Sequence, residues 1–295
     1  MQNVTPVAVA VLVAELVPAA LFGFAPQWPP RLVQRWPARA RTLLPALFGL
    51  PYAFLAGWLH IFQWNWFALY ALLPVGMAWL LGQAARVDPE QKGNWRDGLI
   101  LLTLGLAVDL RWFDSGWPAG WESLGKLLLV NAGLYGFLAI RQLSGTGFDF
   151  KLKLRDWTSG LRELLFFAPL VLGFGFALGF LHLHAARPSL GTAFLRWMAI
   201  FFFVAVPEEL FFRGWVQNLL ERRLGRTLAL IVASILFGLS HFNKRNPVAV
   251  HFNWRYVLLA TLAGIFYGRA WRDHRRVPAS TITHTFVDWI WSWWF

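Results

Sequence analysis

Three charged residues stand out because the stretch around them is apolar. Glu208, Glu209 and Arg213 lie within six positions of one another, in an apolar run that starts near Ala199. A charge inside a membrane span is costly, so such residues are usually functional or paired. On a helix, Glu209 and Arg213 share one face, with the acid before the base, which favours an ion pair. We therefore predict that these two residues form a buried ion pair that supports the site.

The predicted pair leaves Glu208 without a partner. It lies about 100° away from Glu209 around the helix. A carboxylate without a partner suits a general base, which takes a proton from a reacting water molecule. We therefore predict a catalytic role for Glu208. The alternative is that both glutamates and Arg213 form one buried ion network with a purely structural role.

Two histidines further along the chain could complete such a site. His241 follows Phe237 by four residues, so the phenyl ring would lie one turn below the imidazole and fix its direction. His284 and Asp288 are also four residues apart, so both could face one point. Alternatively, Asp288 orients His284 and stabilises its charge, or the two residues only satisfy each other. A lone histidine is more often structural, so the assignment of His241 depends on the other segments.

The composition places these residues in a membrane protein. Of the 295 residues, 57% are hydrophobic and only 14% are charged, whereas soluble domains carry about 25% charged residues. Cysteine is absent, which excludes disulfides, thiolate catalysis and metal sites with cysteine ligands. In a soluble protein, the net charge of +12 would indicate nucleic acid as a partner. Here we expect arginine-rich cytoplasmic loops that face anionic lipid, and no nucleic acid.

The apolar runs predict an all-α fold, a polytopic transmembrane helical bundle of about ten spans. We assign residues 1–150 to N-terminal accessory transmembrane helices and residues 151–295 to the catalytic core. The expected spans are 4–24, 43–62, 65–84, 97–112, 126–140, 164–183, 194–212, 227–242, 255–271 and 278–295.

The basic residues predict the orientation of this bundle. If the N-terminus is outside, most of the 27 lysines and arginines fall on cytoplasmic loops, as the positive-inside rule requires. The many arginines and tryptophans and the lack of cysteine indicate a bacterial inner (plasma) membrane. Upright helices would place His241 about 20 Å from the cytoplasmic end and His284 about 10 Å in. Tilted helices would remove that difference in depth.

Two pairs of glycines predict close contacts between helices. Gly175 and Gly179 form a GxxxG pattern in the sixth predicted span, and Gly264 and Gly268 form one in the ninth. Small residues at this spacing let two helix backbones approach each other. We expect both patterns to have a packing role.

The order of the three polar motifs resembles the CPBP family, which comprises the CaaX proteases and bacteriocin-processing proteins and is also called the Abi family. The resemblance covers roughly residues 160–295. In this family the third motif often ends in asparagine, and here it ends in Asp288. The motifs are EExxxR at 208–213, FxxxH at 237–241 and HxxxD at 284–288.

This resemblance implies an intramembrane endopeptidase that acts on a membrane-associated protein or peptide. It implies that Glu208 and His241 bind and activate a water molecule, and that His284 and Asp288 stabilise the oxyanion. Glu209, Arg213 and Phe237 would support these groups.

The same residues leave the catalytic type open. We expect a glutamate-type enzyme that requires no metal. The alternative is a zinc ion held by Glu208, His241 and His284, with one position left for water. The family was long described as metalloproteases, so a metalloendopeptidase is the second prediction.

Two functions other than proteolysis are compatible with the motifs. A non-catalytic immunity or sorting partner would keep the fold and use the polar residues for binding. A transporter would use Glu208, Arg213 and Asp288 as an ion pathway, but the sequence has no inverted repeat of the kind that many transporters contain. The oligomeric state is not predictable from the sequence.

Overall fold

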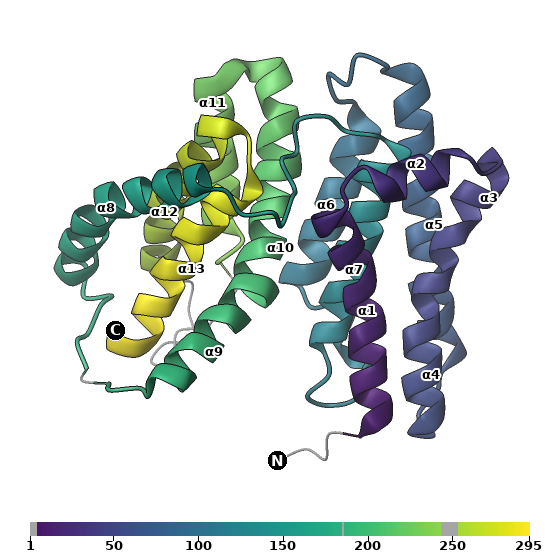
Figure 1. Cartoon of the computed structure of the whole chain (residues 1–295), viewed down its shortest axis with the longest axis horizontal. Helices are drawn as coiled ribbons and strands as arrows, with labels where there is room; N and C mark the ends of the chain where they lie inside the picture. The colour runs from purple at the N-terminus through teal and green to yellow at the C-terminus, as the bar shows by residue number, and fades with distance from the viewer. Residues whose placement is uncertain (1–4, 185, 243–252) are drawn as a thin grey trace. The chain divides into compact units, whose positions relative to one another are not determined.

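A computed structural model describes residues 5–184, 186–242 and 253–295. All of the regular secondary structure within these residues is helical, which confirms the all-α prediction. The chain divides into two compact units, Met1–Ser144 (unit 1) and Gly145–Phe295 (unit 2). Figure 1 shows the helices of both units.

Unit 1 begins with a helix whose start is fixed by a capping residue. The Thr5 hydroxyl accepts a hydrogen bond from the Ala8 amide at 3.2 Å, and Pro6 is the first helical residue. Both features are typical of helix N-termini. The elements are α1 (Pro6–Phe24), α2 (Trp28–Gln34), α3 (Ala38–Leu43), η1 (Leu44–Gly49), α4 (Leu50–Trp58), α5 (Trp64–Val87), α6 (Trp95–Asp109), η2 (Asp114–Gly116), α7 (Ser123–Leu134) and η3 (Tyr135–Ile140).

Unit 2 contains a continuous helical segment that bends at a glycine. Elements α9 to α11 follow one another without a loop, and Gly225 interrupts the helix with φ 74° and ψ 170°. Glycine adopts this conformation at little cost. The elements are α8 (Leu154–Ala177), α9 (Leu190–Ile200), η4 (Phe201–Ala205), α10 (Val206–Glu209), η5 (Leu210–Gln217), α11 (Asn218–Leu239), α12 (Trp254–His274) and α13 (Val277–Trp294).

Long apolar helices identify the chain as an integral membrane protein. Each predicted span coincides largely with helical residues, although residue 4, where the first was expected to begin, lies outside the described part. The number ten stays a prediction, because the longest apolar segment contains two of the predicted spans. Five described segments are long and apolar enough to cross a membrane: Pro6–Phe24, Trp64–Val87, Ser123–Ile140, Leu154–Ala177 and Leu190–Leu239.

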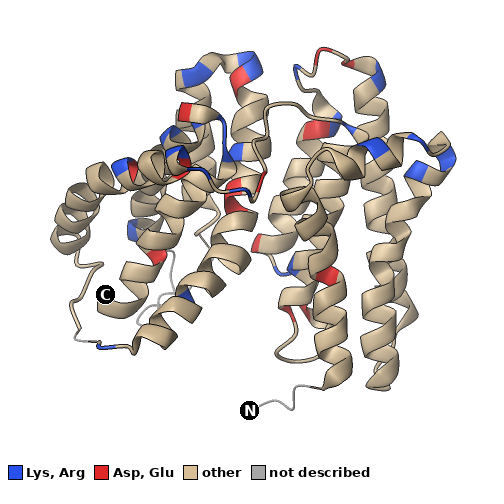
Figure 2. Ribbon diagram, viewed as in Figure 1, with Lys and Arg blue, Asp and Glu red and all other residues tan. Residues whose placement is uncertain are grey.

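The basic residues are unevenly distributed within each unit. In Figure 2, many lysines and arginines of unit 1 lie near α2, α3 and the connection from α5 to α6. In unit 2, many lie near the bend of α11 and the connection from α12 to α13. In each unit these segments lie towards one end of the helices, as expected for loops on one side of a membrane.

Glycines bring α11 and α12 into close contact. A Cβ atom at Gly264 would lie 3.0 Å from Ser234 Cα, and one at Gly268 would lie 2.4 Å from Leu230 Cδ1. The packing role predicted for this pair is confirmed. In the other pair only Gly175 has a packing role, since a Cβ atom there would lie 2.5 Å from Leu181 Cδ1. The prediction was wrong for Gly179, because α8 ends at Ala177 and Gly179 adopts a positive φ of 60° outside the helix.

Candidate active site

The two glutamates lie in a helix that departs from α geometry on both sides. Glu208 and Glu209 belong to the short α10, which lies between the π-helical segments η4 and η5. Pro207 contributes to this departure, since it has no amide hydrogen for the helical hydrogen bond. Short π-helical segments are frequent at functional sites. The predicted helix is therefore present, but it is not a uniform α-helix.

Glu209 and Arg213 form the predicted ion pair. Arg213 Nη1 donates to Glu209 Oε1 at 3.0 Å, and both side chains are fully buried. Arg213 Nη2 donates to the Gly264 carbonyl oxygen at 3.0 Å, which connects the pair to α12. The guanidinium carbon also lies 4.6 Å from the centre of the Phe237 ring. Arg213 thus holds three helices around one buried charge.

His284 is the residue at which the acidic side chains meet. Its Nδ1 atom lies 2.8 Å from Glu209 Oε1. Its Nε2 atom lies 3.5 Å from Asp288 Oδ2 and 3.9 Å from Glu208 Oε2. Three carboxylates therefore surround one imidazole. The sequence assigned Glu209 to Arg213 alone, whereas in the structure the same oxygen atom also contacts His284.

Aromatic rings fix the orientation of the His284 ring. Tyr267 stacks on it with a centroid distance of 4.7 Å and an interplanar angle of 18°. Phe237 meets it edge-on at 5.7 Å. Tyr267 was missed by the sequence analysis, because an aromatic residue in an apolar helix is normally part of the core. The sequence feature that could have marked Tyr267 is its position directly before Gly268, which belongs to the GxxxG pattern.

His241 lies just beyond the end of α11 and is also buried. Its Nδ1 atom lies 2.9 Å from the Phe237 carbonyl oxygen, a contact that requires a proton on Nδ1. Nε2 is then the nitrogen that can accept a hydrogen bond. The rings of Phe237 and Tyr256 lie 4.9 Å and 4.7 Å from the imidazole. Phe237 therefore orients His241 through its carbonyl group as well as its ring.

A cavity of about 250 Å³ in unit 2 brings the two histidines together. His241, His284 and Asp288 line it, and most of the other lining residues are apolar. The difference in depth expected from upright helices therefore does not separate the motifs. Glu208 is not among the lining residues that the structure describes, and its contact with this group is through His284. We call this space the unit 2 cavity.

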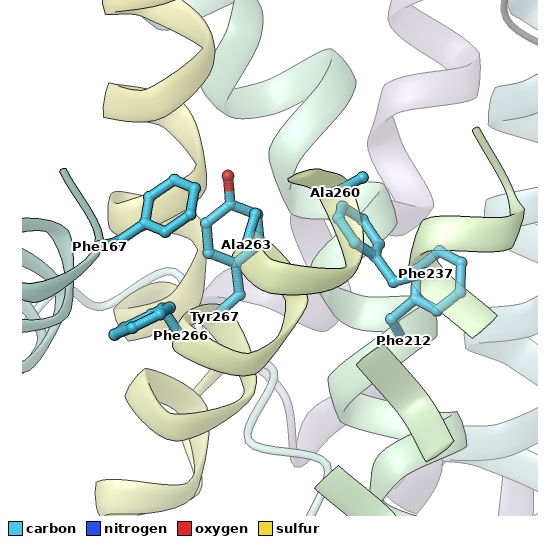
Figure 3. Packing of buried hydrophobic residues seen from close by; sticks show 7 residues of the cluster. All are labelled: Phe167, Phe212, Phe237, Ala260, Ala263, Phe266 and Tyr267. Carbon is cyan, nitrogen blue, oxygen red and sulfur yellow. The ribbon is translucent and has the colours of Figure 1, made fainter. Parts of the chain in front are cut away.

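Part of the cavity wall comes from a cluster of buried aromatic and small residues. Figure 3 shows this cluster, in which Phe167 and Phe237 lie on either side of Tyr267. Ala260 and Ala263, both on α12, belong to the same cluster. All five residues also line the unit 2 cavity. The hydrophobic core of unit 2 is thus continuous with the candidate site.

The zinc alternative requires Glu208, His241 and His284 to face one point. Across the described ranges, no three histidine, aspartate or glutamate side chains are arranged to hold a metal ion. The residues proposed as zinc ligands therefore do not form a metal site in this geometry.

One protein family matches the part of the chain that contains these residues. Residues 190–290 match the sequence model described as type II CAAX prenyl endopeptidase Rce1-like. A search of curated proteins and a search of solved structures gave no match. The matched segment includes all four residues predicted to be catalytic, which are Glu208, His241, His284 and Asp288. Residues 190–290 are therefore an Rce1-like domain, which confirms the predicted resemblance of this segment to the CPBP family.

Proposed function

We propose that this protein is an intramembrane endopeptidase that hydrolyses a peptide bond in a membrane-associated protein or peptide. The observation that carries the proposal is the arrangement around His284, whose Nε2 atom faces both Glu208 and Asp288 within the family-matched segment. Peptide hydrolysis needs a base for water and donors for the developing oxyanion, and this arrangement offers candidates for both. The substrate belongs to the membrane phase or its surface, because the site is built from apolar helices.

In the proposed mechanism, Glu208 and His241 position the attacking water. Glu208 takes one proton from this water as its oxygen attacks the carbonyl carbon of the substrate. His241 accepts a hydrogen bond from the same water through Nε2, since its Nδ1 proton faces the Phe237 carbonyl. When the carbon–nitrogen bond breaks, Glu208 returns the proton to the leaving amine. One carboxylate thus serves as base and then as acid.

His284 and Asp288 stabilise the tetrahedral intermediate. His284 acts in its doubly protonated form, which the surrounding carboxylates favour, so its Nδ1–H group donates to Glu209 and its Nε2–H group donates to the oxyanion. Asp288 lies 3.5 Å from that nitrogen and acts on its charge and direction. Asp288 therefore supports His284 from the Nε2 side, while Glu209 supports it from the Nδ1 side. Fixed donors of this kind are among the largest contributions to acyl-transfer catalysis.

The test compares protein termini in membranes that contain wild-type protein or the Glu208→Ala variant. New termini that depend on Glu208, and that are also lost with His241→Ala, support the proposal. Retained cleavage in both folded variants contradicts it. An assay of ion or solute flux in vesicles separates this activity from transport, the alternative function for the same polar residues.

The Glu209→Gln variant separates the two glutamates. Glu209 contacts both Arg213 and His284, so its loss leaves a buried cation with a weaker partner. Breaking a buried ion pair typically costs about 3–5 kcal/mol. We expect lower thermal stability for Glu209→Gln, and near-normal stability with no cleavage for Glu208→Gln. Equal unfolding temperatures for the two variants would contradict this division of roles.

We further propose that the reaction requires no metal ion. Elemental analysis of the purified protein, with cleavage assayed before and after chelation, tests this point. Stoichiometric zinc that is lost together with activity would contradict it and assign the protein to the metalloendopeptidases.

A further inference from the structure

We propose that Glu15 is a proton-binding site inside unit 1, and that its proton holds α1 against α7. The inference is independent of the proposed proteolysis, because Glu15 lies outside both the family-matched segment and unit 2. The ligand is a single proton. The carboxyl group binds it while the two helices are packed and releases it when the pH rises, so unit 1 contains a pH-sensitive helix contact.

Glu15 lies at the middle of an apolar span. It is the tenth of the 19 residues of α1, so about 14 Å of helix separates it from either end. It is the only charged residue of that helix and is 2% exposed. The other buried residues of α1 are Ala8, Val11, Phe22 and Gly23, so the carboxyl group belongs to the packed face. Bulk water cannot solvate a charge at this position.

Asn131 on α7 supplies the described hydrogen bonds to the Glu15 side chain. Its Nδ2 group donates to Glu15 Oε2 at 2.9 Å and also to the Glu15 carbonyl oxygen at 2.8 Å. Glu15 Oε1 is buried and has no hydrogen-bond partner among the described residues. One amide donor thus serves only one of the two carboxylate oxygens. A buried carboxylate in this state is very costly, whereas the protonated acid has no charge to solvate.

No cation within the described ranges forms an ion pair with Glu15. Three elements form the main contacts of α1, and each carries one charged or titratable side chain. Lys126 on α7 is exposed. Arg31 on α2 is exposed and donates to a glutamine side chain at 2.7 Å. The Tyr52 hydroxyl on α4 accepts a hydrogen bond from a backbone amide at 3.1 Å. Each of these groups has solvent or another partner, so a proton is what neutralises Glu15.

Loss of this proton would place a charge between α1 and α7. The buried side chains of both helices are otherwise apolar, apart from Asn131. A charge at this depth is stabilised by moving towards water or lipid headgroups, and such a movement separates the helices. A rise in pH therefore weakens the packing of α1, and a fall in pH restores it.

Infrared spectroscopy of the full-length protein in lipid vesicles detects the proton directly. A protonated carboxylic acid has a C=O stretching band that an ionised carboxylate lacks. We expect such a band in the wild-type spectrum at pH 7, its loss at alkaline pH, and its absence from Glu15→Gln at every pH. Glu15→Asp keeps a carboxyl group and should shift the band rather than remove it. Glu90→Gln, which removes an exposed acid, should leave the band unchanged.

A second measurement tests whether the proton holds the helices together. A fluorophore on Ala119→Cys, an exposed position in unit 1, follows the unfolding of wild-type protein and of Glu15→Gln in detergent micelles. Glutamine is permanently neutral, whereas Glu15 loses its proton on unfolding at any pH above about 4.3, the usual pKa of an exposed glutamate. The unfolding constant of the wild type, divided by that of Glu15→Gln, should therefore rise about tenfold per pH unit between about pH 5.5 and pH 7.5.

Three results would overturn the proposal. They are the lack of a protonated-acid band at pH 7, a band that Glu15→Gln retains, and a ratio of unfolding constants that does not change with pH. If Glu15→Gln does not fold, the Glu15→Asp spectrum decides, and an unshifted band contradicts the assignment to Glu15. None of these results depends on proteolysis, which Glu208→Ala tests separately.

Discussion

The His284 imidazole is fixed by contacts on its face, its edge and one ring nitrogen. Tyr267 covers the face, Phe237 meets the ring edge-on, and Glu209 holds Nδ1 at 2.8 Å. These contacts determine the direction of Nε2, the atom that would donate to an oxyanion. A displacement of about 1 Å in such a group can cost about a hundredfold in rate.

Tyr267 is therefore expected to act as a positioning residue through its ring. Tyr267→Leu removes the stacked ring and should lower kcat about tenfold to a hundredfold, with a smaller change in KM. Tyr267→Phe keeps the ring and should restore most of the rate. Kinetics with a peptide taken from a Glu208-dependent cleavage site, measured across pH, checks both variants.

A purely structural role for Tyr267 would give a different pattern. It would lower the unfolding temperature and the amount of active protein, and leave the pH profile of the remaining enzyme unchanged. If Tyr267→Phe is as impaired as Tyr267→Leu, the hydroxyl group carries the effect and the stacking argument is wrong.

Charge and spacing predicted most of the side chains that the structure groups around His284. Glu208, Glu209 and Arg213 were recognisable because charges are costly in an apolar helix. The second partner of Glu209 was not predictable, since it depends on how α13 approaches α10. Tyr267 was hidden for a different reason, because a ring in an apolar helix gives no signal of what it touches.

At the level of elements, the contact between α11 and α12 determines where His241 lies. Gly238 is three residues before His241, and a Cβ atom there would lie 1.9 Å from Thr261 Oγ1 and 2.6 Å from the Val257 carbonyl oxygen. No side chain fits without a shift of α12. The end of α11, and the histidine beyond it, are thus held by a backbone contact.

Gly238→Ala should therefore lower both stability and activity. Overpacking of this kind typically costs about 1–3 kcal/mol. Gly173→Ala is the control, since Gly173 lies within α8 with nothing near its Cβ position. That change should stabilise the protein by about 0.5–1 kcal/mol. Thermal unfolding followed by tryptophan fluorescence measures both, and equal effects of the two substitutions would contradict the packing argument.

In unit 1, hydrogen bonds and ion pairs of buried side chains fix the connection between α5 and α6. Asp88 accepts hydrogen bonds from the Lys92 and Gly93 amides at 3.0 Å and 2.8 Å. The buried Arg141 side chain donates to Asp88 at 2.6 Å and to Asp97 at 3.0 Å. Burial raises the pKa of Asp88, but the two amide hydrogen bonds and the charge of Arg141 outweigh burial and hold this pKa below its usual value.

This arrangement predicts an acid-dependent part of the stability. Because the pKa of Asp88 is lower in the folded state, its contribution is complete above the unfolded pKa of about 3.9 and is lost as the pH falls through the folded value. Asp88→Asn should cost about 1.5–3 kcal/mol at pH 6, and the difference from wild type should shrink below about pH 4. Thermal unfolding between pH 6 and pH 3 measures this difference.

Glu90→Gln is the control for Asp88, since the Glu90 side chain is 69% exposed and its only described ion pair, with Lys92, lies at the surface. Surface ion pairs contribute little, so this variant should follow the wild type at every pH. A pH-independent effect of Asp88→Asn would contradict the electrostatic argument.

The sequence predicted where helices occur better than how they bend. Apolar runs identified the helical regions, because burying or solvating a long apolar stretch in lipid requires a helix. The bend at Gly225 and the π-helical turns around α10 were not predictable, since they depend on local hydrogen bonding and packing. The error at Gly179 has the same origin, because a glycine pattern does not reveal where a helix ends.

At the scale of the whole molecule, the family match and the candidate site both lie in unit 2. Unit 1 nevertheless carries its own buried polar contact. Asn131 on α7 donates to the Glu15 carboxylate at 2.9 Å and to the Glu15 carbonyl oxygen at 2.8 Å. Buried polar groups of this kind join helices within a membrane. Unit 1 is therefore a specifically packed bundle, and its accessory role stays a prediction.

The orientation of unit 1 can be tested directly because the chain contains no cysteine. A single introduced cysteine is then the only site for a thiol reagent. Glu90, in the α5–α6 connection, and Ala119, in the α6–α7 connection, are both exposed. With the N-terminus outside and α6 crossing the bilayer, the two residues lie on opposite sides of the membrane.

We expect the Glu90→Cys variant to react with a membrane-impermeant maleimide only after the cells are opened, and the Ala119→Cys variant to react in intact cells. The reason is the concentration of basic residues near the α5–α6 connection, which favours the cytoplasmic side. Labelling in detergent is the control, because both thiols should react with the maleimide once the membrane no longer separates them. The reverse pattern would invert the predicted orientation, and labelling of both residues from one side would show that α6, which has only 15 residues, does not cross the membrane.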